Sequence, residues 1–224
     1  MSKLLNYFKA NSFGNAMTKW YHYFDIYETH FQKFVGKPVK ILEIGVWQGG
    51  SAAMWKQYFG KDARIIGIDI LEECKKFEDS QLKVYIGDQA DVNFLKELVA
   101  KEGPFDIIMD DGGHYMNQQV TNFKELYYSL KDGGIYLCED THTNYWAEFD
   151  GGYKKPNTFI ELTKNLIDEL NAFHSKTSEL KVTKFTINTT AIHIYDSVVV
   201  FEKKNRMKPD SAMIGRVIIK SPLA

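Results

Sequence analysis

Cysteine is scarce in this chain of 224 residues, and the scarcity excludes two classes of small stabilised domain. The two cysteines, Cys74 and Cys138, are 138 − 74 = 64 positions apart, with no C-x-x-C pair and no array of cysteine and histidine around them. A disulfide scaffold and a zinc ribbon are therefore not expected. A reducing compartment fits this composition.

An excess of charge of one sign is also lacking. Lys and Arg total 28 and Asp and Glu total 29, which gives a net charge of −1. This balance disfavours a dedicated nucleic-acid binder and a polybasic membrane-surface protein. No apolar run approaches the roughly 18 residues that a membrane span requires, and residues 1–13 are too polar for a secretory leader. We therefore expect a cytoplasmic protein whose partners are neither nucleic acid nor membrane.

What the chain does contain is an alternation of short apolar runs with amphipathic stretches. Each run is rich in β-branched residues and ends near glycine or an acid, as buried parallel strands do. The stretches between them are long enough to cross over a sheet as helices. The pattern predicts an α/β fold with a Rossmann-like, doubly wound, mostly parallel sheet. Strands are expected at 39–46, 64–70, 83–88, 105–112 and 133–140, and helices at 51–59, 91–102, 114–130 and 158–173.

The two ends of the chain depart from this alternation. In residues 1–35 apolar side chains repeat at intervals of three and four, which predicts an N-terminal helical segment packed on the core of a domain spanning residues 36–224. Near the other end, residues 182–190 and 191–204 read as two strands. Their closeness in sequence predicts an antiparallel addition at one edge of the sheet.

The first expected strand ends in a glycine-rich loop, which is where an open parallel sheet binds ligands. In the segment LEIGVWQGGS, Glu43 is followed by Gly45, Gly49 and Ser51, and the glycines let the backbone approach a ligand closely. The spacing G-x-x-x-G-G is neither the dinucleotide fingerprint nor a P-loop, which favours a ligand without phosphates. Asp69 ends the second strand, 69 − 49 = 20 residues after Gly49, where an acid can accept both hydroxyls of a ribose. Two structural interpretations remain open: Gly45 forms a simple strand-to-helix turn, and Asp69 caps the next helix.

Four acids end the fourth and fifth expected strands: Asp110 and Asp111, then Glu139 and Asp140. Carboxyl ends of parallel strands share one edge, so these charges would repel unless a cation neutralises them. Oxygen ligands without a thiolate suit Mg²⁺ or Mn²⁺. His114, three residues after Asp111, would lie near such a metal and take a proton from a hydroxyl. Capping by Asp110 or Asp140, and a surface role for His114, are the alternatives.

Two further side chains follow the acids in the segment EDTHTNYW. His142 and Trp146 are candidates for the wall of a substrate pocket. The remaining histidines lack such a setting, and their pattern assigns them no chemical role: His22, His30, His174 and His193.

The order of these motifs resembles the class I S-adenosylmethionine-dependent methyltransferases over residues 40–140. The resemblance rests on Glu43-x-Gly45 and on the acid that ends the second strand. It implies that Gly45 and Gly49 border the methionine part of the cofactor and that Asp69 holds the ribose. It further places Asp88 and Gln89 near the adenine and Asp110 on the sulfonium side, with Glu43 and Ser51 in the same cofactor site.

A narrower resemblance is carried by FDIIMDDGGH and GGIYLCEDTHTNYW. These blocks resemble the metal-dependent sugar O-methyltransferases of macrolide tailoring, of mycinamicin type, and related cephalosporin-hydroxylase-like proteins. The resemblance implies methyl transfer to a sugar hydroxyl that chelates Mg²⁺ or Mn²⁺, with His114 as general base. The implied metal ligands are Asp111, Glu139 and Asp140. The segment TKWYHYFDIYETHF also resembles the family, which implies that Lys19, His22 and Tyr27 close over cofactor or substrate.

Two functions of other classes are weighed against this one. A non-haem iron oxygenase could draw its two-histidine, one-carboxylate set from His114, His142 and either Asp111 or Glu139, but it would leave the glycine loop unexplained. The second alternative is a non-catalytic partner subunit that has a cofactor-binding fold. This alternative does not explain why the four acids are present. The aromatic residues of both ends are also candidate contacts for a homo-oligomer.

Overall fold

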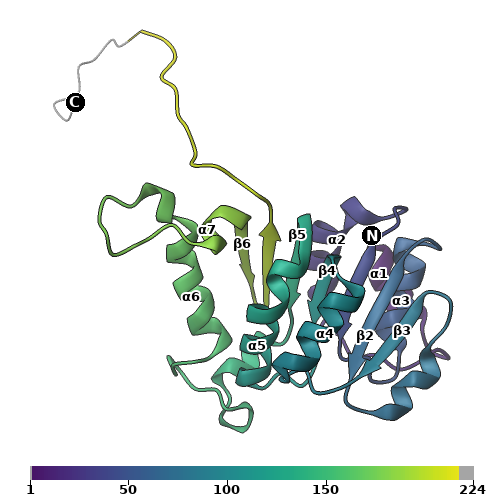
Figure 1. The fold of residues 1–224 in the computed structure, drawn as a ribbon. Coiled ribbons are helices and arrows are strands. Elements are labelled where there is room, and N and C mark those ends of the chain that lie inside the picture. Colours follow the sequence, from purple (N-terminus) through teal and green to yellow (C-terminus); the bar gives the residue numbers. More distant parts are fainter. Residues whose placement is uncertain (1, 217–224) are drawn as a thin grey trace.

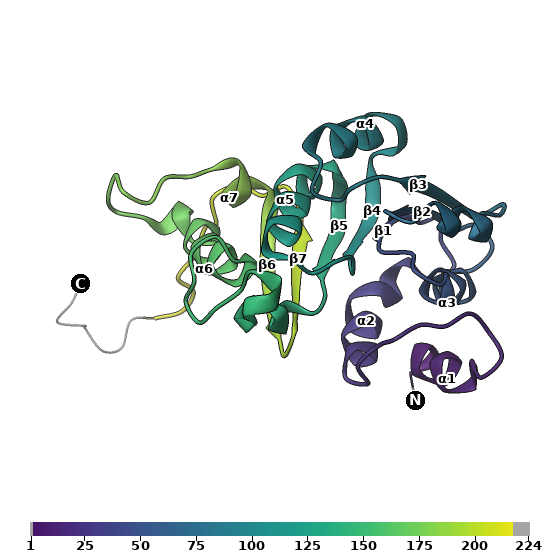
Figure 2. The ribbon, with the colours of Figure 1, turned by 90° about the horizontal axis from the view of Figure 1, so that it is seen from below.

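The computed structural model describes residues 2–216, which build a seven-stranded sheet between two layers of helices (Figure 1 and Figure 2). The strand order is β3-β2-β1-β4-β5-β7-β6, and β1 to β5 pair in parallel. This confirms the predicted doubly wound α/β class. The strands are β1 (Lys40–Ile44), β2 (Arg64–Asp69), β3 (Leu82–Ile86), β4 (Phe105–Asp110), β5 (Leu130–Cys138), β6 (Thr189–Tyr195) and β7 (Val198–Lys203).

Helices cover both faces of the sheet (Figure 2). One face carries α1 (Lys3–Ala10), α2 (Tyr23–Phe31) and α3 (Gly50–Phe59), and the other carries α4 (Val92–Glu102), α5 (Met116–Leu126), α6 (Phe159–Leu170) and α7 (Lys184–Asn188). Short 3₁₀ turns connect them: η1 (Gln32–Phe34), η2 (Glu72–Phe77), η3 (Tyr127–Ser129), η4 (Thr141–Tyr145), η5 (Ala147–Phe149) and η6 (Ala172–His174).

Successive side chains of each central strand enter different apolar layers. Ile41 of β1 packs with the layer of α2 and α3, whereas Leu42 packs with the layer of α4 and α5. Both side chains are fully buried, because a parallel strand covered on two faces has no solvent side. This explains why the strands read as continuous apolar runs in the sequence.

The C-terminal prediction is right in kind and wrong in its boundaries. An antiparallel pair does join the sheet edge, with β7 antiparallel to both β5 and β6. The expected strand at 182–190 is instead mostly α7, which begins where the Thr183 side chain accepts a hydrogen bond from the Thr186 backbone amide. Both strands come from the single run 191–204 and from the residues just before it, since the chain turns back at Asp196 and Ser197.

The N-terminal helices share the core of the sheet. Phe24, Tyr27 and Phe31 of α2 are fully buried and pack with Trp55 of α3 in one apolar cluster. Tyr27 and Phe31 are stacked, with ring centroids 6.0 Å apart. Helix α2 is thereby fixed against the sheet, close to the carboxyl ends of β4 and β5. Among residues 2–216, no helix combines the length and apolar character that a membrane crossing needs.

Candidate functional site

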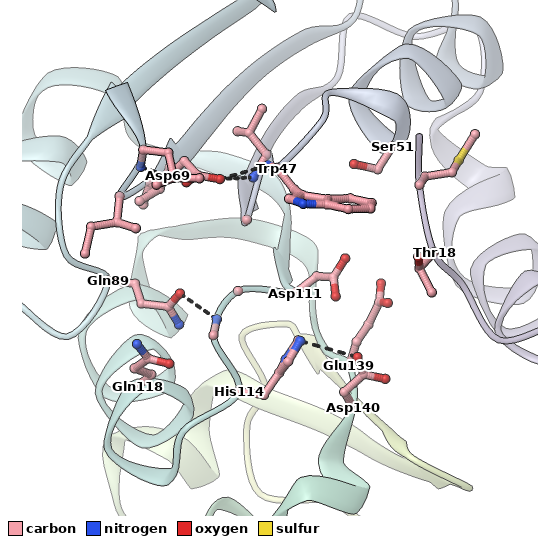
Figure 3. A pocket seen from close by; sticks show the side chains of 18 of the residues that line it. Thr18, Trp47, Ser51, Asp69, Gln89, Asp111, His114, Gln118, Glu139 and Asp140 are labelled. Carbon is pink, nitrogen blue, oxygen red and sulfur yellow. Dashed lines mark hydrogen bonds and ion pairs between the residues drawn. The ribbon is translucent and has the colours of Figure 1, made fainter. Parts of the chain in front are cut away.

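A cavity of about 560 Å³ opens at the carboxyl ends of the parallel strands (Figure 3). It lies where the strand order reverses between β1 and β4, the usual ligand position in an open α/β sheet. Its walls come from the loop after β1, from the ends of β2 to β5 and from residues 16–20, which precede α2. The volume is that of a site for a small molecule.

The loop after β1 is held in a conformation that requires glycine. Gly45 has φ +94°, and a Cβ atom there would lie 2.1 Å from the backbone oxygen of Asp111. Asp69 fixes the loop from β2, because its Oδ2 accepts hydrogen bonds from the backbone amides of Val46 (3.0 Å) and Trp47 (2.8 Å). Asp69 therefore shapes the loop in addition to lining the cavity.

The segment after β3 brings to the cavity a side-chain amide, that of Gln89, whose nitrogen has no hydrogen-bond partner. Asp88 Oδ1 accepts a hydrogen bond from the Ala90 amide (2.8 Å), and Gln89 Oε1 accepts one from the Gly113 amide (3.0 Å). The Nε2 group of Gln89 is buried without a hydrogen-bond partner. A buried donor left without a partner costs free energy, so this group is suited to a ligand acceptor.

Two carboxylates, one buried and one partly exposed, share one ammonium group beside the cavity. The parallel register of β4 and β5 places Asp111 beside Glu139, one step beyond the last paired residues. Lys19 pairs with both: its Nζ contacts Asp111 Oδ2 and lies 2.8 Å from Glu139 Oε2. The Tyr27 hydroxyl donates to the other oxygen of Glu139 at 2.8 Å. The two carboxylates are thus paired with the ammonium group of Lys19.

Asp140 and His114 form the second half of the same wall, and both have positive φ angles, +52° and +60°. His114 Nε2 lies 3.4 Å from Asp140 Oδ2 (Figure 3). The Tyr23 hydroxyl donates to Asp140 Oδ1 at 2.6 Å and lies 2.7 Å from Ser197 Oγ. His142 Nδ1 also contacts Ser197 Oγ and is 3.9 Å from Asp140.

Burial dominates the electrostatics of this wall. It raises the pKa of Asp111 to about 6 and that of Glu139 to about 7, although Lys19 opposes both shifts. Burial alone would lower the pKa of Lys19, but the charges of Asp111 and Glu139 raise it above its ordinary value. Burial lowers the pKa of His114, with Asp140 opposing. The His114 ring is therefore neutral near pH 7 and can accept a proton.

Comparison with known proteins agrees with this geometry. Residues 42–141, which include the glycine loop and the acids, match the family profile described as "Methyltransferase domain". Residues 42–141 are a methyltransferase domain.

Two curated relatives of the chain are named as O-methyltransferases. The chain is 33% identical over 189 residues to Mycinamicin VI 2''-O-methyltransferase of Micromonospora griseorubida, covering 79% of this chain and 47% of that protein. It is 34% identical over 203 residues to 8-demethyl-8-(2-methoxy-alpha-L-rhamnosyl)-tetracenomycin-C 3'-O-methyltransferase of Streptomyces olivaceus, covering 84% of this chain and 52% of that protein. The chain thus spans about half the length of these relatives.

A solved structure gives the same result. MycE methyltransferase from the mycinamycin biosynthetic pathway, in complex with Mg, SAH and Mycinamycin VI, superposes with a TM-score of 0.79 at 31% identity. The match covers 91% of this chain and 53% of that one. The O-methyltransferase from Bacillus cereus, at 14% identity and a TM-score of 0.55, shares the fold. The class I methyltransferase fold is thereby confirmed.

Most of the predicted ligand-facing residues of the methyltransferase domain line the cavity. Figure 3 shows Asp111, His114, Glu139 and Asp140 converging at one wall. The predicted residues that line it are Lys19, Gly45, Ser51, Asp69, Asp88, Gln89, Asp111, His114, Glu139 and Asp140.

Asp110 does not lie where the resemblance placed it. It is 1% exposed, and its carboxylate accepts hydrogen bonds from Asn122 of α5 (3.0 Å) and from Tyr136 of β5 (2.9 Å). Side chains alternate between the faces of a strand, so Asp110 points toward α5 while Asp111 points toward the cavity. The expected position of Asp110 on the sulfonium side is therefore corrected.

Three other predicted residues support the wall from behind instead of lining it. Glu43 is buried and accepts a hydrogen bond from Trp55 Nε1 at 2.9 Å. A Cβ atom at Gly49 would lie 2.8 Å from the Phe77 ring, so this glycine lets η2 pack closely. Tyr27 is fully buried and reaches the site only through Glu139.

The rim residues lie beside the cavity. His142 and Trp146 have ring centroids 4.7 Å apart, and Trp20 is 5.8 Å from His142. Within residues 2–216, the ligand atoms that cluster in the site belong to Asp111, His114 and Asp140, which leaves His142 outside the set that an iron oxygenase would need. His22 is turned toward the Asp196 carbonyl, 3.0 Å from its Nε2.

Sequence reasoning missed several lining residues, including Tyr23, Trp47 and Gln118. Tyr23 could have been found, because it lies four residues before Tyr27 on the same helix face. Trp47 lies in the glycine loop at φ +47° and is half exposed, a conformation that no pattern in the sequence indicates.

Proposed function

We propose that the protein is an S-adenosylmethionine-dependent, divalent-metal-dependent O-methyltransferase that acts on a hydroxyl of a sugar or a glycosylated small molecule. The observation that carries the proposal is the convergence of four residues at the wall of the cavity. The ligand atoms of Asp111, His114 and Asp140 lie within 4.8 Å of one another, and Glu139 shares the Lys19 ammonium with Asp111. Relatives named for O-methylation of mycinamicin VI and of a rhamnosyl tetracenomycin support the acceptor class.

The cavity has three features that fit S-adenosylmethionine. Gly45, at φ +94°, lets the loop after β1 pack against the Asp111 backbone at the cavity wall, and Asp69 lines the cavity at the end of β2. The unpaired Nε2 of Gln89 is a donor for an adenine nitrogen. The cofactor, when bound, supplies the methyl group as an electrophile on sulfur. MycE, whose structure contains SAH, supports this choice of cofactor.

The acids fit a divalent cation for two reasons. Their donors are carboxylate oxygens, the ligands that Mg²⁺ prefers. The ammonium of Lys19 already bridges Asp111 and Glu139, which marks a position where positive charge is stabilised. We assign Asp111, Glu139 and Asp140 as the residues that would hold the ion. A bound Mg²⁺ would lower the pKa of an acceptor hydroxyl as a Lewis acid.

His114 is assigned as the general base. Its neutral ring takes the proton of the acceptor hydroxyl at Nε2, which faces the acids. Asp140 Oδ2, 3.4 Å from Nε2, stabilises the imidazolium that results. Tyr23 holds the other oxygen of Asp140 and thereby keeps this carboxylate oriented toward His114.

The aromatic rim is assigned to the acceptor. Trp20 and Trp146 are 55% and 44% exposed and lie on either side of His142, next to the acids. Exposed ring faces of this kind pack against the apolar faces of sugars. We also place the protein in the cytoplasm, which fits Cys74 and Cys138 as buried free thiols.

Methyl transfer from labelled S-adenosylmethionine to a panel of glycosides tests the proposal. We expect Mg²⁺-dependent transfer, and a kcat about 10²–10⁴-fold lower for His114→Gln with unchanged cofactor affinity, because only the proton acceptor is lost. Asp111→Asn should lose the dependence on Mg²⁺. His174→Ala, which removes an exposed histidine elsewhere, is the control. Wild-type turnover in His114→Gln would remove this residue from the base role.

A further inference from the structure

A second cluster of possible metal ligands lies outside the cavity. It consists of His30 on α2, His193 on β6 and Glu202 on β7, with one ligand atom from each lying within 4.8 Å of the others. His193 Nε2 is 2.9 Å from Glu202 Oε1, and His30 Nδ1 is 3.8 Å from the same oxygen. None of these residues lines the cavity of the methyltransferase domain.

The separations are close to those of a bound ion. Zn²⁺ binds histidine nitrogen at about 2.0–2.1 Å and carboxylate oxygen at about 2.0–2.2 Å in tetrahedral geometry, which sets roughly 3.3 Å between ligand atoms. The two measured separations, 2.9 and 3.8 Å, lie on either side of that value. His193 and Glu202 have side chains 35% and 36% exposed, so they have room to adjust and an ion has access from solvent.

The buried histidine is already oriented as a ligand. His30 is 4% exposed, and its Nε2 lies 2.9 Å from the Tyr195 hydroxyl. A hydrogen bond from Nε2–H to this oxygen leaves the lone pair on Nδ1, the nitrogen that faces Glu202.

Two lysines carry charge near the cluster, Lys33 and Lys204. Lys33 Nζ donates to the Gly133 carbonyl at 3.0 Å. Burial and the charge of Lys204 lower the pKa of Lys33, whereas the Glu202 carboxylate raises it. The nitrogen-rich donor set distinguishes this cluster from the acids of the cavity.

We propose that His30, His193 and Glu202 form a second divalent-metal site, specific for Zn²⁺ and similar nitrogen-binding ions over Mg²⁺. Two imidazoles and one carboxylate are a common zinc set, with water in the fourth position. Mg²⁺ prefers oxygen ligands and is therefore a poor occupant. The proposal does not rest on the methyltransferase activity.

An ion at this site would join α2 to the C-terminal hairpin. Tyr23, Tyr27 and His30 are spaced at i, i+4 and i+7, so they share one face of α2. The first two bind Asp140 and Glu139, and the third reaches the hairpin. The ion would therefore fix the helix that holds two acids of the active site from behind.

Calorimetric titration of EDTA-stripped protein with ZnCl₂, in excess Mg²⁺ to occupy the cavity site, tests the proposal. We expect one Zn²⁺ per chain for the wild type and for Asp111→Asn, which alters only the other cluster. His193→Ala and Glu202→Gln should each weaken Zn²⁺ binding roughly tenfold or more, a loss of about 1.4 kcal/mol. His174→Ala, an exposed histidine in η6, should bind Zn²⁺ as the wild type does.

Cobalt supplies an independent readout. Co²⁺ bound by two imidazoles and a carboxylate in tetrahedral geometry gives strong visible absorption, which should be present in the wild type and absent from His193→Ala. Circular dichroism checks that each variant is folded. Absence of Zn²⁺ binding to the wild type in excess Mg²⁺, or wild-type affinity in both His193→Ala and Glu202→Gln, would overturn the proposal.

Discussion

The ammonium group of Lys19 lies between two carboxylates at the corner of the cavity, the partly exposed Asp111 and the buried Glu139. Lys19 is 8% exposed, and unpaired carboxylates in its surroundings would be costly to keep ionised. The residue therefore serves as the counter-cation of the acids. A divalent ion at the same acids would supply that charge in its place.

Replacing Lys19 by methionine should make folding depend on Mg²⁺. Without added metal, Lys19→Met is expected to lower the free energy of unfolding by up to about 3–5 kcal/mol, because the two acids lose their partner. Added Mg²⁺ should then raise Tm by more in Lys19→Met than in the wild type. Thermal denaturation followed by circular dichroism measures both. The exposed Lys9→Met is the control, and an equal Mg²⁺ effect in all three proteins would contradict this account.

The sequence predicts which acids follow β4 and β5, but it does not predict which of two adjacent acids faces the cavity. Asp111 and Glu139 come directly after β4 and β5, which places them at one edge. Asp110 differs from Asp111 by one position, and the pleat turns it toward Asn122. The strand boundary decides which of two adjacent acids faces the ligand, and a sequence pattern does not fix a boundary to one residue.

At the scale of elements, the loop between β1 and α3 is the segment most constrained by close packing. Gly45 N donates to the Ile68 carbonyl at 2.9 Å, while its Cα approaches the Asp111 backbone. The loop is thus wedged between β2 and β4. Any side chain at position 45 must displace one of them.

Gly45→Ala should therefore weaken cofactor binding. The positive φ alone is expected to cost about 1–3 kcal/mol, and the contact at 2.1 Å should shift the loop away from the cavity. We expect affinity for S-adenosylmethionine to fall roughly tenfold or more. Gly60→Ala is the matched control, since Gly60 has a similar φ of +97° with nothing within 4 Å of a Cβ atom. Equal cofactor affinities in the two variants would refute the packing argument.

The helices and strands before residue 140 follow their sequence patterns closely, because each has a clear period and a clear end. The C-terminal segment does not. In α7, Phe185 is buried while Lys184 and Asn188 are not, and five residues are too few to show a helical period. In the run 191–204, a two-residue turn at Asp196 and Ser197 carries no glycine, so the hairpin gives no sequence signal.

At the scale of the whole molecule, the two ends of the parallel strands have different roles: the carboxyl ends carry the cavity, and the amino ends carry ion pairs that stabilise the fold. The cavity lies at the carboxyl ends of the strands, and Glu102 lies toward their amino ends, at the end of α4. There it pairs with Arg64 at 2.9 Å, Lys83 at 3.4 Å and Lys40 at 3.5 Å, from three adjacent strands. Changes at this edge should alter stability without touching the site.

Glu102 should make the protein sensitive to acid. Burial alone would raise its pKa, but the Tyr85 hydroxyl, Arg64 and Lys40 bring the pKa below its ordinary value of 4.5. A depressed pKa contributes stability above 4.5 that is lost as the pH falls through the pKa of the folded state. Glu102→Gln should be less stable than the wild type by about 1–2 kcal/mol near neutral pH, and the difference should shrink in acid.

Urea denaturation of both proteins across this pH range measures the effect. A stability difference that stays constant from neutral pH to below the pKa of Glu102 would show that the carboxylate charge is not its cause. Cofactor affinity near neutral pH is the internal control, since Glu102 lies away from the cavity.

The most direct test of the central claim is calorimetric titration of the purified protein with S-adenosylmethionine, with and without Mg²⁺. The account predicts saturable binding of one cofactor per chain, competed by the demethylated product of the same cofactor and weakened roughly tenfold or more in Gly45→Ala. No binding of S-adenosylmethionine under either condition, by a folded protein, would contradict the assignment of the cavity and with it the proposed reaction.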